Sequence, residues 1–252
     1  MTTPLLSVEH VGVRFGGLVA IADLRFDVRE GEIVSLIGPN GAGKTTAFNV
    51  VTGFLKPSQG RVSFGGTPLD GLKPHQITRL GLARTFQRTS VFPDDSVLDN
   101  VLIGLHRQPG PRRASHDAAL AILDLVGLSA RAHDKAGTLA YGEQRLVGVA
   151  LALATQPTML LLDEPVSGMN ASETQTVVNL LRAIRQRGIT ILLVEHDMRM
   201  VMEVSDRILV LNYGRLIAEG PPSAIRSDPT VIEAYLGKGT AAREAGLAAV
   251  DA

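Results

Sequence analysis

Gly38-Pro39-Asn40-Gly41-Ala42-Gly43-Lys44-Thr45-Thr46 is the most informative stretch of the chain. The apolar run Ile33–Ile37 comes directly before it and is short and rich in β-branched residues, which is typical of a buried parallel strand. Ala47–Val51 follows and predicts the opening of a helix. Because a strand, a glycine-rich turn with the pattern G-x-x-x-x-G-K-T and a helix follow one another, the sequence predicts a phosphate-binding loop.

The physical reason for this prediction lies in the backbone of the loop. Glycines allow successive N–H groups to converge on one small concavity, and a helix N-terminus adds partial positive charge. Lys44 would reach the outer phosphates of a nucleotide, and the hydroxyl of Thr45 would ligate Mg²⁺. A glycine-rich turn that happens to precede Lys-Thr is the alternative. The succession of elements favours a nucleotide-binding protein.

The composition is that of an ordinary globular protein, with one large domain or one domain that carries an inserted lobe. The chain has 252 residues, of which 45% are hydrophobic and 20% charged, and its 25 basic and 25 acidic residues cancel. Nucleic-acid binders usually carry a basic face, so we expect no nucleic acid as a partner. The chain has no cysteine, which excludes disulfides, thiolate metal sites and thiol catalysis.

We expect neither a signal peptide nor a segment that spans a bilayer. Met1–Leu6 has no basic region and no long apolar core. The longest apolar stretch, Leu146–Ala154, is far shorter than the ~20 residues that span a bilayer. The chain is therefore not expected to cross a membrane by itself.

The segment between residues 5 and 31 predicts antiparallel strands that lead into the loop, because short β-like pieces alternate there with turns at Gly16-Gly17 and Glu30-Gly31. Phe15 precedes the first of these turns. Its ring could stack on an adenine base, since any base offers a π-face, or it could be an ordinary core or turn phenylalanine. Both interpretations stay open at this point.

The sequence pattern becomes helical between about residues 95 and 153. Ser96 with Asp99 resembles a capping box at the start of a helix. This stretch lies between two parts of an α/β pattern. We therefore predict a helical lobe inserted into the nucleotide-binding core.

Residues 108–113 predict an exposed loop because they are rich in helix breakers, and residues 118–126 predict a helix after it. Gly142 lies where a further helix would begin, and taken alone it indicates an ordinary helix cap. Gln87, ahead of the helical stretch, is by itself most simply a surface glutamine.

Two consecutive carboxylates end the next apolar strand, Met159–Leu162, at Asp163 and Glu164. Such a pair is costly at the end of a buried strand unless a cation or a reaction uses it. Because side chains alternate along a strand, we expect one to face Mg²⁺ and the other to face an attacking water. His196 follows the buried strand Ile189–Val194, where open α/β sheets place their ligands, although a surface or capping histidine is the alternative.

Helix caps are predicted at two further places. Asn170 is expected to cap a helix over Ala171–Arg187. Asp228 is expected to cap a short helix that starts at Pro229.

The C-terminal part of the chain predicts a hairpin of residues 207–211 and 215–219, followed by a short helix from Pro221. Residues 237–252 are rich in Ala and Gly and predict a frayed or weakly helical tail.

Taken together, these motifs resemble those of the ATP-binding subunits of ABC transporters, from about Leu6 to Gly237. The resemblance identifies the Walker A motif with Gly38–Thr46, the Q-loop glutamine with Gln87 and the signature with Leu139-Ala140-Tyr141-Gly142-Glu143-Gln144. It identifies Walker B with Met159–Asp163 and the catalytic glutamate with Glu164. The D-loop corresponds to Ser167–Asn170 and the H-loop to His196.

The resemblance implies an α/β fold, namely a P-loop NTPase core with a parallel sheet, an N-terminal antiparallel β subdomain and an inserted helical subdomain. The ATPase domain would cover residues 5–237 and the helical subdomain about 95–153. Residues 238–252 would form a flexible tail.

The resemblance also implies a reaction, the hydrolysis of ATP with Mg²⁺. The implied roles are phosphate binding for the loop and Lys44, metal binding for Thr45, Gln87 and Asp163, general-base catalysis for Glu164, γ-phosphate sensing for His196, and adenine stacking for Phe15.

Partners follow from the same resemblance. The chain would form a head-to-tail dimer with a second cassette, identical or a paralogue, so that each ATP lies between the phosphate loop of one subunit and Gly142 of the other. It would sit at the cytoplasmic face of the inner (plasma) membrane, bound to integral permease subunits and served indirectly by a periplasmic binding protein.

Local details resemble the branched-chain amino acid subfamily, whose relatives also import amides and urea. The segments that carry this likeness are Leu36–Asn40, Ala83–Gln87, Leu139–Gly142, Glu195–Met198 and Ile232–Gly237. The alternatives are an ABC ATPase of lipid or lipopolysaccharide export and a non-transport ABC ATPase of DNA repair or translation. The latter usually has long coiled coils or two cassettes in one chain, and this sequence has neither.

Several positions depart from the wider family pattern. The signature has Ala140 and Tyr141 where Ser and Gly are usual, so a hydroxyl contact to the γ-phosphate is lost and backbone N–H groups would replace it. Gly148 and Leu151 stand where relatives often carry Glu and Arg, and Asn170 stands in place of Asp.

Overall fold

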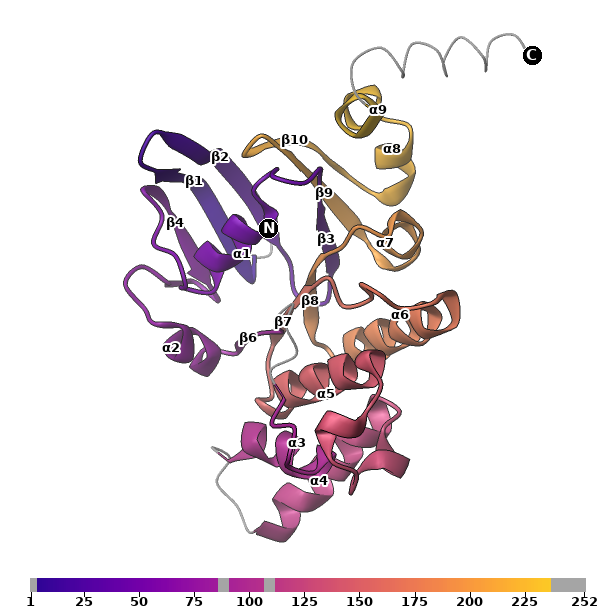
Figure 1. Cartoon of the computed structure of the whole chain (residues 1–252). Coiled ribbons are helices and arrows are strands. Elements are labelled where there is room, and N and C mark those ends of the chain that lie inside the picture. The colour runs from indigo at the N-terminus through magenta and orange to yellow at the C-terminus, as the bar shows by residue number, and fades with distance from the viewer. Residues whose placement is uncertain (1–3, 86–90, 107–111, 237–252) are drawn as a thin grey trace, which may run out of the picture. The chain divides into compact units, whose positions relative to one another are not determined.

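The computed structural model describes residues 4–85, 91–106 and 112–236 (Figure 1). The chain forms two compact units, the first made of residues 1–71 and 196–252 and the second of residues 72–195. We describe each unit by itself.

The first unit contains a mixed sheet with the strand order β5-β4-β1-β2-β10-β9-β3. Its strands are β1 (Leu6–Phe15), β2 (Leu18–Val28), β3 (Ile33–Ile37), β4 (Gln59–Phe64), β5 (Thr67–Pro68), β9 (Arg207–Asn212) and β10 (Arg215–Gly220). β1 pairs antiparallel with β2 and β4, and β9 with β10, whereas β3 pairs parallel with β9. The predicted N-terminal antiparallel strands and the C-terminal hairpin are confirmed.

β3 and helix α1 (Lys44–Val51) flank the phosphate loop. All five residues of β3 are buried, as expected of a parallel strand that is covered on both faces. α1 begins at Lys44, inside the glycine-rich motif, rather than at Ala47 as predicted. The fully buried Phe48 anchors the helix in the core.

Three short helices, α7 (Met198–Val204), α8 (Pro222–Arg226) and α9 (Pro229–Leu236), complete the first unit. α8 contacts β9 and β10, and α9 contacts β10 (Figure 1). Asp228 caps α9 as predicted, since its Oδ1 accepts a hydrogen bond from the N–H of Thr230 at 2.7 Å. These helices share a core cluster with β3 and β9, formed by Ile37, Val201, Ile208, Val210, Ile225 and Val231.

The second unit contains a parallel sheet with the order β8-β7-β6. Its strands are β6 (Leu82–Arg84), β7 (Met159–Asp163) and β8 (Thr190–Val194), and the helices α2 (Pro74–Arg79) and α6 (Ala171–Gln186) accompany them. β7 and β8 are buried along their whole lengths. Asn170 caps α6 as predicted, with its Oδ1 accepting from the N–H groups of Ser172 and Glu173 at 2.9 and 3.0 Å.

The predicted helical lobe of the second unit consists of α3 (Val97–Leu105), α4 (Arg112–Leu125) and α5 (Tyr141–Ala154), with 3₁₀ turns at Ser129–Arg131 and Ala136–Thr138 (Figure 1). Ser96 caps α3 as predicted, accepting from the Asp99 N–H at 3.0 Å.

The predicted boundary between the exposed loop and α4 is wrong. α4 begins at Arg112 rather than near Ala118, so Arg112 and Arg113 belong to the helix and not to the loop. The physical reason is that no Gly or Pro occurs between Arg112 and Leu125. The rest of the predicted loop, residues 108–111, lies outside the described residues.

The domain limits 5–237 and about 95–153 remain predictions, and the tail 238–252 lies outside the described residues. None of the helices in the described ranges combines the length and the hydropathy needed to cross a bilayer.

Gly38→Ala should lower the free energy of unfolding by at least about 3 kcal/mol, because an added Cβ would lie 2.0 Å from the Leu211 carbonyl oxygen. Gly41→Ala is the matched control. Gly41 has a φ of +79° and open space around the position of a Cβ, so only the backbone cost of about 1–2 kcal/mol is expected. Urea unfolding of the nucleotide-free protein measures both, and equal losses would contradict the crowding at Gly38.

Candidate functional site

The phosphate loop runs from the end of β3 into α1 and is tied to the rest of the first unit through its backbone. The Ala42 N–H donates to the Pro39 carbonyl at 3.1 Å, and the Ala42 carbonyl accepts from the Gly214 N–H, in the β9–β10 turn, at 2.9 Å. A Cβ at Gly43, whose φ is +108°, would lie 2.9 Å from the Ala20 carbonyl oxygen. The loop path therefore requires glycine at Gly38 and Gly43.

The N-terminus of α1 is open to an anion. Gly43 occupies the N-cap position and offers no side-chain acceptor, and the first turn contains no acidic residue. The first N–H groups of a helix have no partner within the helix. These groups, together with the loop amides, form the convergent donors that a phosphate requires.

Lys44 is folded back over the loop and is only 7% exposed. Its Nζ donates to the carbonyl oxygens of Gly38 and Pro39, at 2.6 and 3.0 Å. The next residue, Thr45, is exposed. The ammonium is thus held at the loop, and the Thr45 hydroxyl is open to a ligand.

Phe15 ends β1, immediately before the turn at Gly16-Gly17, and half of its surface is exposed. An exposed ring on a strand end offers a stacking face, as the adenine-binding prediction requires. That role stays a prediction.

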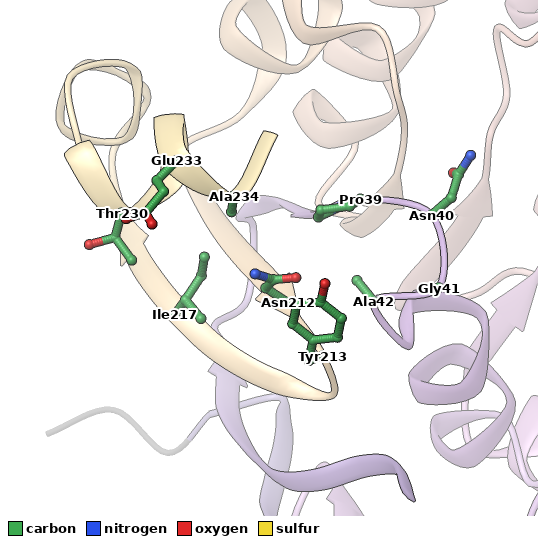
Figure 2. Close-up of a pocket in the computed structure, with 10 residues that line it drawn as sticks. All are labelled: Pro39, Asn40, Gly41, Ala42, Asn212, Tyr213, Ile217, Thr230, Glu233 and Ala234. Carbon is green, nitrogen blue, oxygen red and sulfur yellow. The ribbon is translucent and has the colours of Figure 1, made fainter. Parts of the chain in front are cut away.

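A cavity of about 480 Å³ lies between the phosphate loop and α9 (Figure 2). Residues 39–42 line one side of it, Asn212 at the end of β9 and Tyr213 of the β9–β10 turn another, and Glu233 and Ala234 of α9 a third. The neighbouring Tyr235 forms a hydrogen bond with the backbone of Gly38, and burial raises the pKa of its phenol to about 12. α9 thus contacts the first glycine of the loop. No local sequence pattern predicts this contact, because Tyr235 and Gly38 lie far apart in the chain.

Asp163, the last residue of β7, forms a buried ion pair. Its Oδ2 lies 2.9 Å from Nη2 of Arg84 on β6, and the two side chains are 3% and 8% exposed. Its other oxygen, Oδ1, is buried and has no hydrogen-bond partner among the described residues. One carboxylate oxygen is thus a buried acceptor without a partner among the described residues.

Glu164 leaves the strand conformation, with a φ of +51°. Its N–H donates to the Val194 carbonyl at 2.8 Å, and its carbonyl accepts a hydrogen bond from Nη1 of Arg145. Because β7 ends at Asp163, the alternation argument that predicted opposite directions for Asp163 and Glu164 does not apply to Glu164. The special backbone conformation, rather than strand alternation, sets the place of its carboxylate.

The segment Leu139–Gln144 leads into α5, as predicted for Gly142. Two side chains fold back onto the segment itself: the Glu143 carboxylate accepts from the Ala140 N–H at 3.0 Å, and Gln144 Nε2 donates to the Leu139 carbonyl at 3.0 Å. Ala140 supplies no side-chain cap, so backbone N–H groups are what α5 presents at its start.

Residues 21–167 match the family model described as ABC transporter, which covers more than half of the chain and includes the phosphate loop, α5 and β7. The chain belongs to the ABC transporter family. Residues 215–241 match a second model, described as Branched-chain amino acid ATP-binding cassette transporter. The predicted family is confirmed.

Curated members of the family resemble the chain over nearly its whole length. The high-affinity branched-chain amino acid transport ATP-binding protein LivG of Salmonella typhimurium is 45% identical, covering 94% of this chain and 100% of its own. BraF of Pseudomonas aeruginosa, which bears the same description, is 42% identical with the same coverage. The lipopolysaccharide export system ATP-binding protein LptB of Acidithiobacillus ferridurans is 34% identical, covering 92% and 97%.

Solved ABC cassettes share the fold. A nucleotide-free ATP-binding cassette from an ABC transporter matches with a TM-score of 0.85 at 32% identity, covering 94% of this chain and 100% of its own. A dimeric cassette in a post-hydrolysis state, bound to ADP and phosphate, matches with a TM-score of 0.77 at 26% identity, covering 86% and 98%. The predicted α/β cassette fold is confirmed.

Two of the predicted magnesium ligands carry oxygen donors among the described residues. Thr45 offers an exposed hydroxyl and Asp163 an unpartnered carboxylate oxygen, and both are hard oxygen donors that suit Mg²⁺. No cluster of three or more His, Asp or Glu that could hold a metal exists in the described ranges.

The two remaining predicted residues differ in what the structure describes. His196 is exposed and follows the end of β8, next to Asp197, which caps α7 by accepting from the Met200 N–H at 3.0 Å. Gln87 lies outside the described residues.

Two arginines near the carboxylates were missed from the sequence, Arg84 and Arg145. Their partners lie far away in the chain, and no local pattern marks an arginine that will pair with a buried carboxylate or a carbonyl. The contacts of both arginines depend on the packing of β6, β7 and α5, which the local sequence does not show.

Arg84→Met should lower the free energy of unfolding by about 3–5 kcal/mol, because the Asp163 carboxylate would stay buried without its countercharge. Arg61→Met is the matched control, since Arg61 pairs with Glu9 at an exposed site and its loss should not change the melting temperature measurably. Thermal and urea unfolding measure both. Equally small losses would show that the Arg84–Asp163 pair does not stabilise the unit.

Proposed function

We propose that this chain is the ATP-hydrolysing subunit of an ABC importer for branched-chain amino acids or related small polar solutes such as amides and urea. The observation that carries the proposal is the phosphate loop. It combines an uncapped helix N-terminus, glycines at positive φ and the ammonium of Lys44 in one place.

ATP hydrolysis depends mainly on positioning and electrostatics. On binding, Lys44 would exchange the carbonyls of Gly38 and Pro39 for oxygens of the β- and γ-phosphates, which bind an ammonium more strongly because they are charged. Bound Mg²⁺ would neutralise part of the phosphate charge. Thr45, Asp163 and Gln87 would hold it directly or through water.

Glu164 would take the proton of the attacking water as general base. Its place beside the buried Asp163 and its fixed backbone suit that role, since a base must be held still relative to the water. His196 would contact the γ-phosphate and fix its geometry, and Phe15 would stack on the adenine.

Each ATP would lie between two cassettes arranged head to tail, the second identical or a paralogue. The segment Leu139–Gln144 would present its backbone N–H groups to the ATP of the other subunit, in place of the hydroxyl that Ala140 lacks. The dimeric relative with ADP and phosphate supports a dimer of cassettes.

LivG and BraF support branched-chain amino acids as the cargo, and LptB supports the alternative of lipid or lipopolysaccharide export. As an importer subunit the chain would lie at the cytoplasmic face of the inner membrane, bound to integral permeases and served by a periplasmic binding protein. Neighbouring genes for such a binding protein and two permeases would separate import from export.

Glu164→Gln should retain ATP binding, lower kcat at least about 100-fold and trap an ATP-bound dimer, because the amide keeps the shape but cannot accept the proton. Phosphate release, equilibrium ATP binding and size-exclusion chromatography with Mg²⁺ and ATP measure the three effects. Glu30→Gln, at an exposed turn residue, is the control and should behave as wild type. A kcat of Glu164→Gln equal to that of the wild type would contradict the assignment of Glu164 as the general base.

A further inference from the structure

Arg145 lies at the start of α5 and connects two segments of the second unit. Its Nη1 donates to the carbonyl oxygen of Glu164, and its Nη2 donates to the hydroxyl of Tyr141 at 2.8 Å. The guanidinium carbon also lies 4.9 Å from the centroid of the Tyr141 ring. A single planar side chain therefore contacts both the signature segment and the residue proposed as the base.

Glu164 needs outside contacts to keep its backbone conformation, because an L residue rarely adopts a φ of +51°. β8 supplies one contact, because the Val194 carbonyl accepts a hydrogen bond from the Glu164 N–H. Glu195 supplies another nearby, accepting from the Val166 N–H at 2.9 Å. Arg145 supplies the contact from the helical lobe, and a hydrogen bond from a charged donor is stronger than one between neutral groups.

Tyr141 can contact a ligand or a partner that binds to the signature segment. About half of its surface is exposed (52%), and its hydroxyl is an acceptor for Arg145. A Cβ added at Gly168 would lie 3.6 Å from its ring, so the ring also borders the segment that follows Glu164. A group that displaces the Tyr141 hydroxyl would therefore disturb the arginine that holds Glu164.

We propose that Arg145 is a positioning residue that holds Glu164 in its working conformation and links it to the state of Tyr141 in the signature segment. This inference rests on the proposed function. If the signature segment contacts the ATP of the other cassette, occupancy of that site is transmitted through Tyr141 and Arg145 to the base of the subunit's own site. The link requires two acceptors bound by one rigid fork, which Arg provides and Lys does not.

A purely structural role for Arg145 predicts a different outcome. If Arg145 only connects α5 to the end of β7, its substitution would lower the stability of the chain, and ATP affinity and turnover would fall together. A positioning role affects kcat while ATP affinity is kept, because the phosphate loop, in the first unit, makes the main nucleotide contacts.

Arg145→Lys tests the proposal in the full chain, assayed with Mg²⁺ and ATP. We expect kcat to fall at least about tenfold, while the ATP Kd changes less than about twofold. Arg187→Lys is the matched control, because Nη1 of Arg187 also donates to a backbone carbonyl, that of Ala183, at an exposed site, and it should leave both values unchanged. Thermal unfolding of each variant confirms that the chain is folded.

Tyr141→Phe removes only the hydroxyl and provides the second test. We expect kcat to fall about threefold, and the double variant Arg145→Lys/Tyr141→Phe to be no slower than Arg145→Lys within about twofold, because both changes break one link. If Arg145→Lys does not fold, the Tyr141→Phe result alone decides, and an unchanged kcat overturns the proposal.

The remaining outcomes separate this inference from the proposed function. If the wild type hydrolyses ATP, three results would overturn the role of Arg145 and leave the proposed function standing. They are an unchanged kcat in Arg145→Lys, a parallel loss of ATP affinity and kcat in that variant, and multiplicative effects in the double variant. Absence of hydrolysis in the wild type would overturn the proposed function and this inference with it.

Discussion

The close approach of the phosphate loop to its neighbours is the constraint on which the rest of the site depends. The backbone of Gly38 passes so near the Leu211 carbonyl, and that of Gly43 so near the Ala20 carbonyl, that a side chain at either position would collide. This path brings the loop amides and the uncapped N-terminus of α1 together. It also brings the carbonyls of Gly38 and Pro39 within reach of Lys44, so the ammonium is already held at the loop. In the proposed function, phosphate oxygens would replace these neutral acceptors with charged ones.

At the end of β7, two consecutive acidic residues are held in place beside a buried strand. Asp163 is paired with Arg84, which offsets the cost of burying a carboxylate, and one of its oxygens stays unpartnered among the described residues. Glu164 is held through its backbone, by the Val194 carbonyl and by Arg145. Two arginines from different elements thus hold the two acidic residues, Arg84 through the carboxylate of Asp163 and Arg145 through the backbone of Glu164.

Local features of this structure could be predicted from the sequence, and distant contacts could not. The buried strands at Ile33–Ile37 and Met159–Asp163 and the caps at Asn170 and Asp228 depend on neighbouring residues, so their patterns were sufficient. The Arg84–Asp163 pair, the Arg145–Glu164 hydrogen bond and the contact of Tyr235 with Gly38 join residues far apart in the chain. The left-handed backbone of Glu164 was also missed, because strand alternation cannot foresee where a strand stops.

The central claim is that the phosphate loop, with Lys44 poised on it, binds ATP and supports its hydrolysis. Equilibrium ATP binding and phosphate release by the purified chain, with Mg²⁺ and a second cassette, test it most directly. The account predicts one ATP bound per phosphate loop and steady phosphate release, with both abolished in Lys44→Ala. A wild-type chain that neither binds ATP nor releases phosphate, or a Lys44→Ala variant that does both, would contradict it.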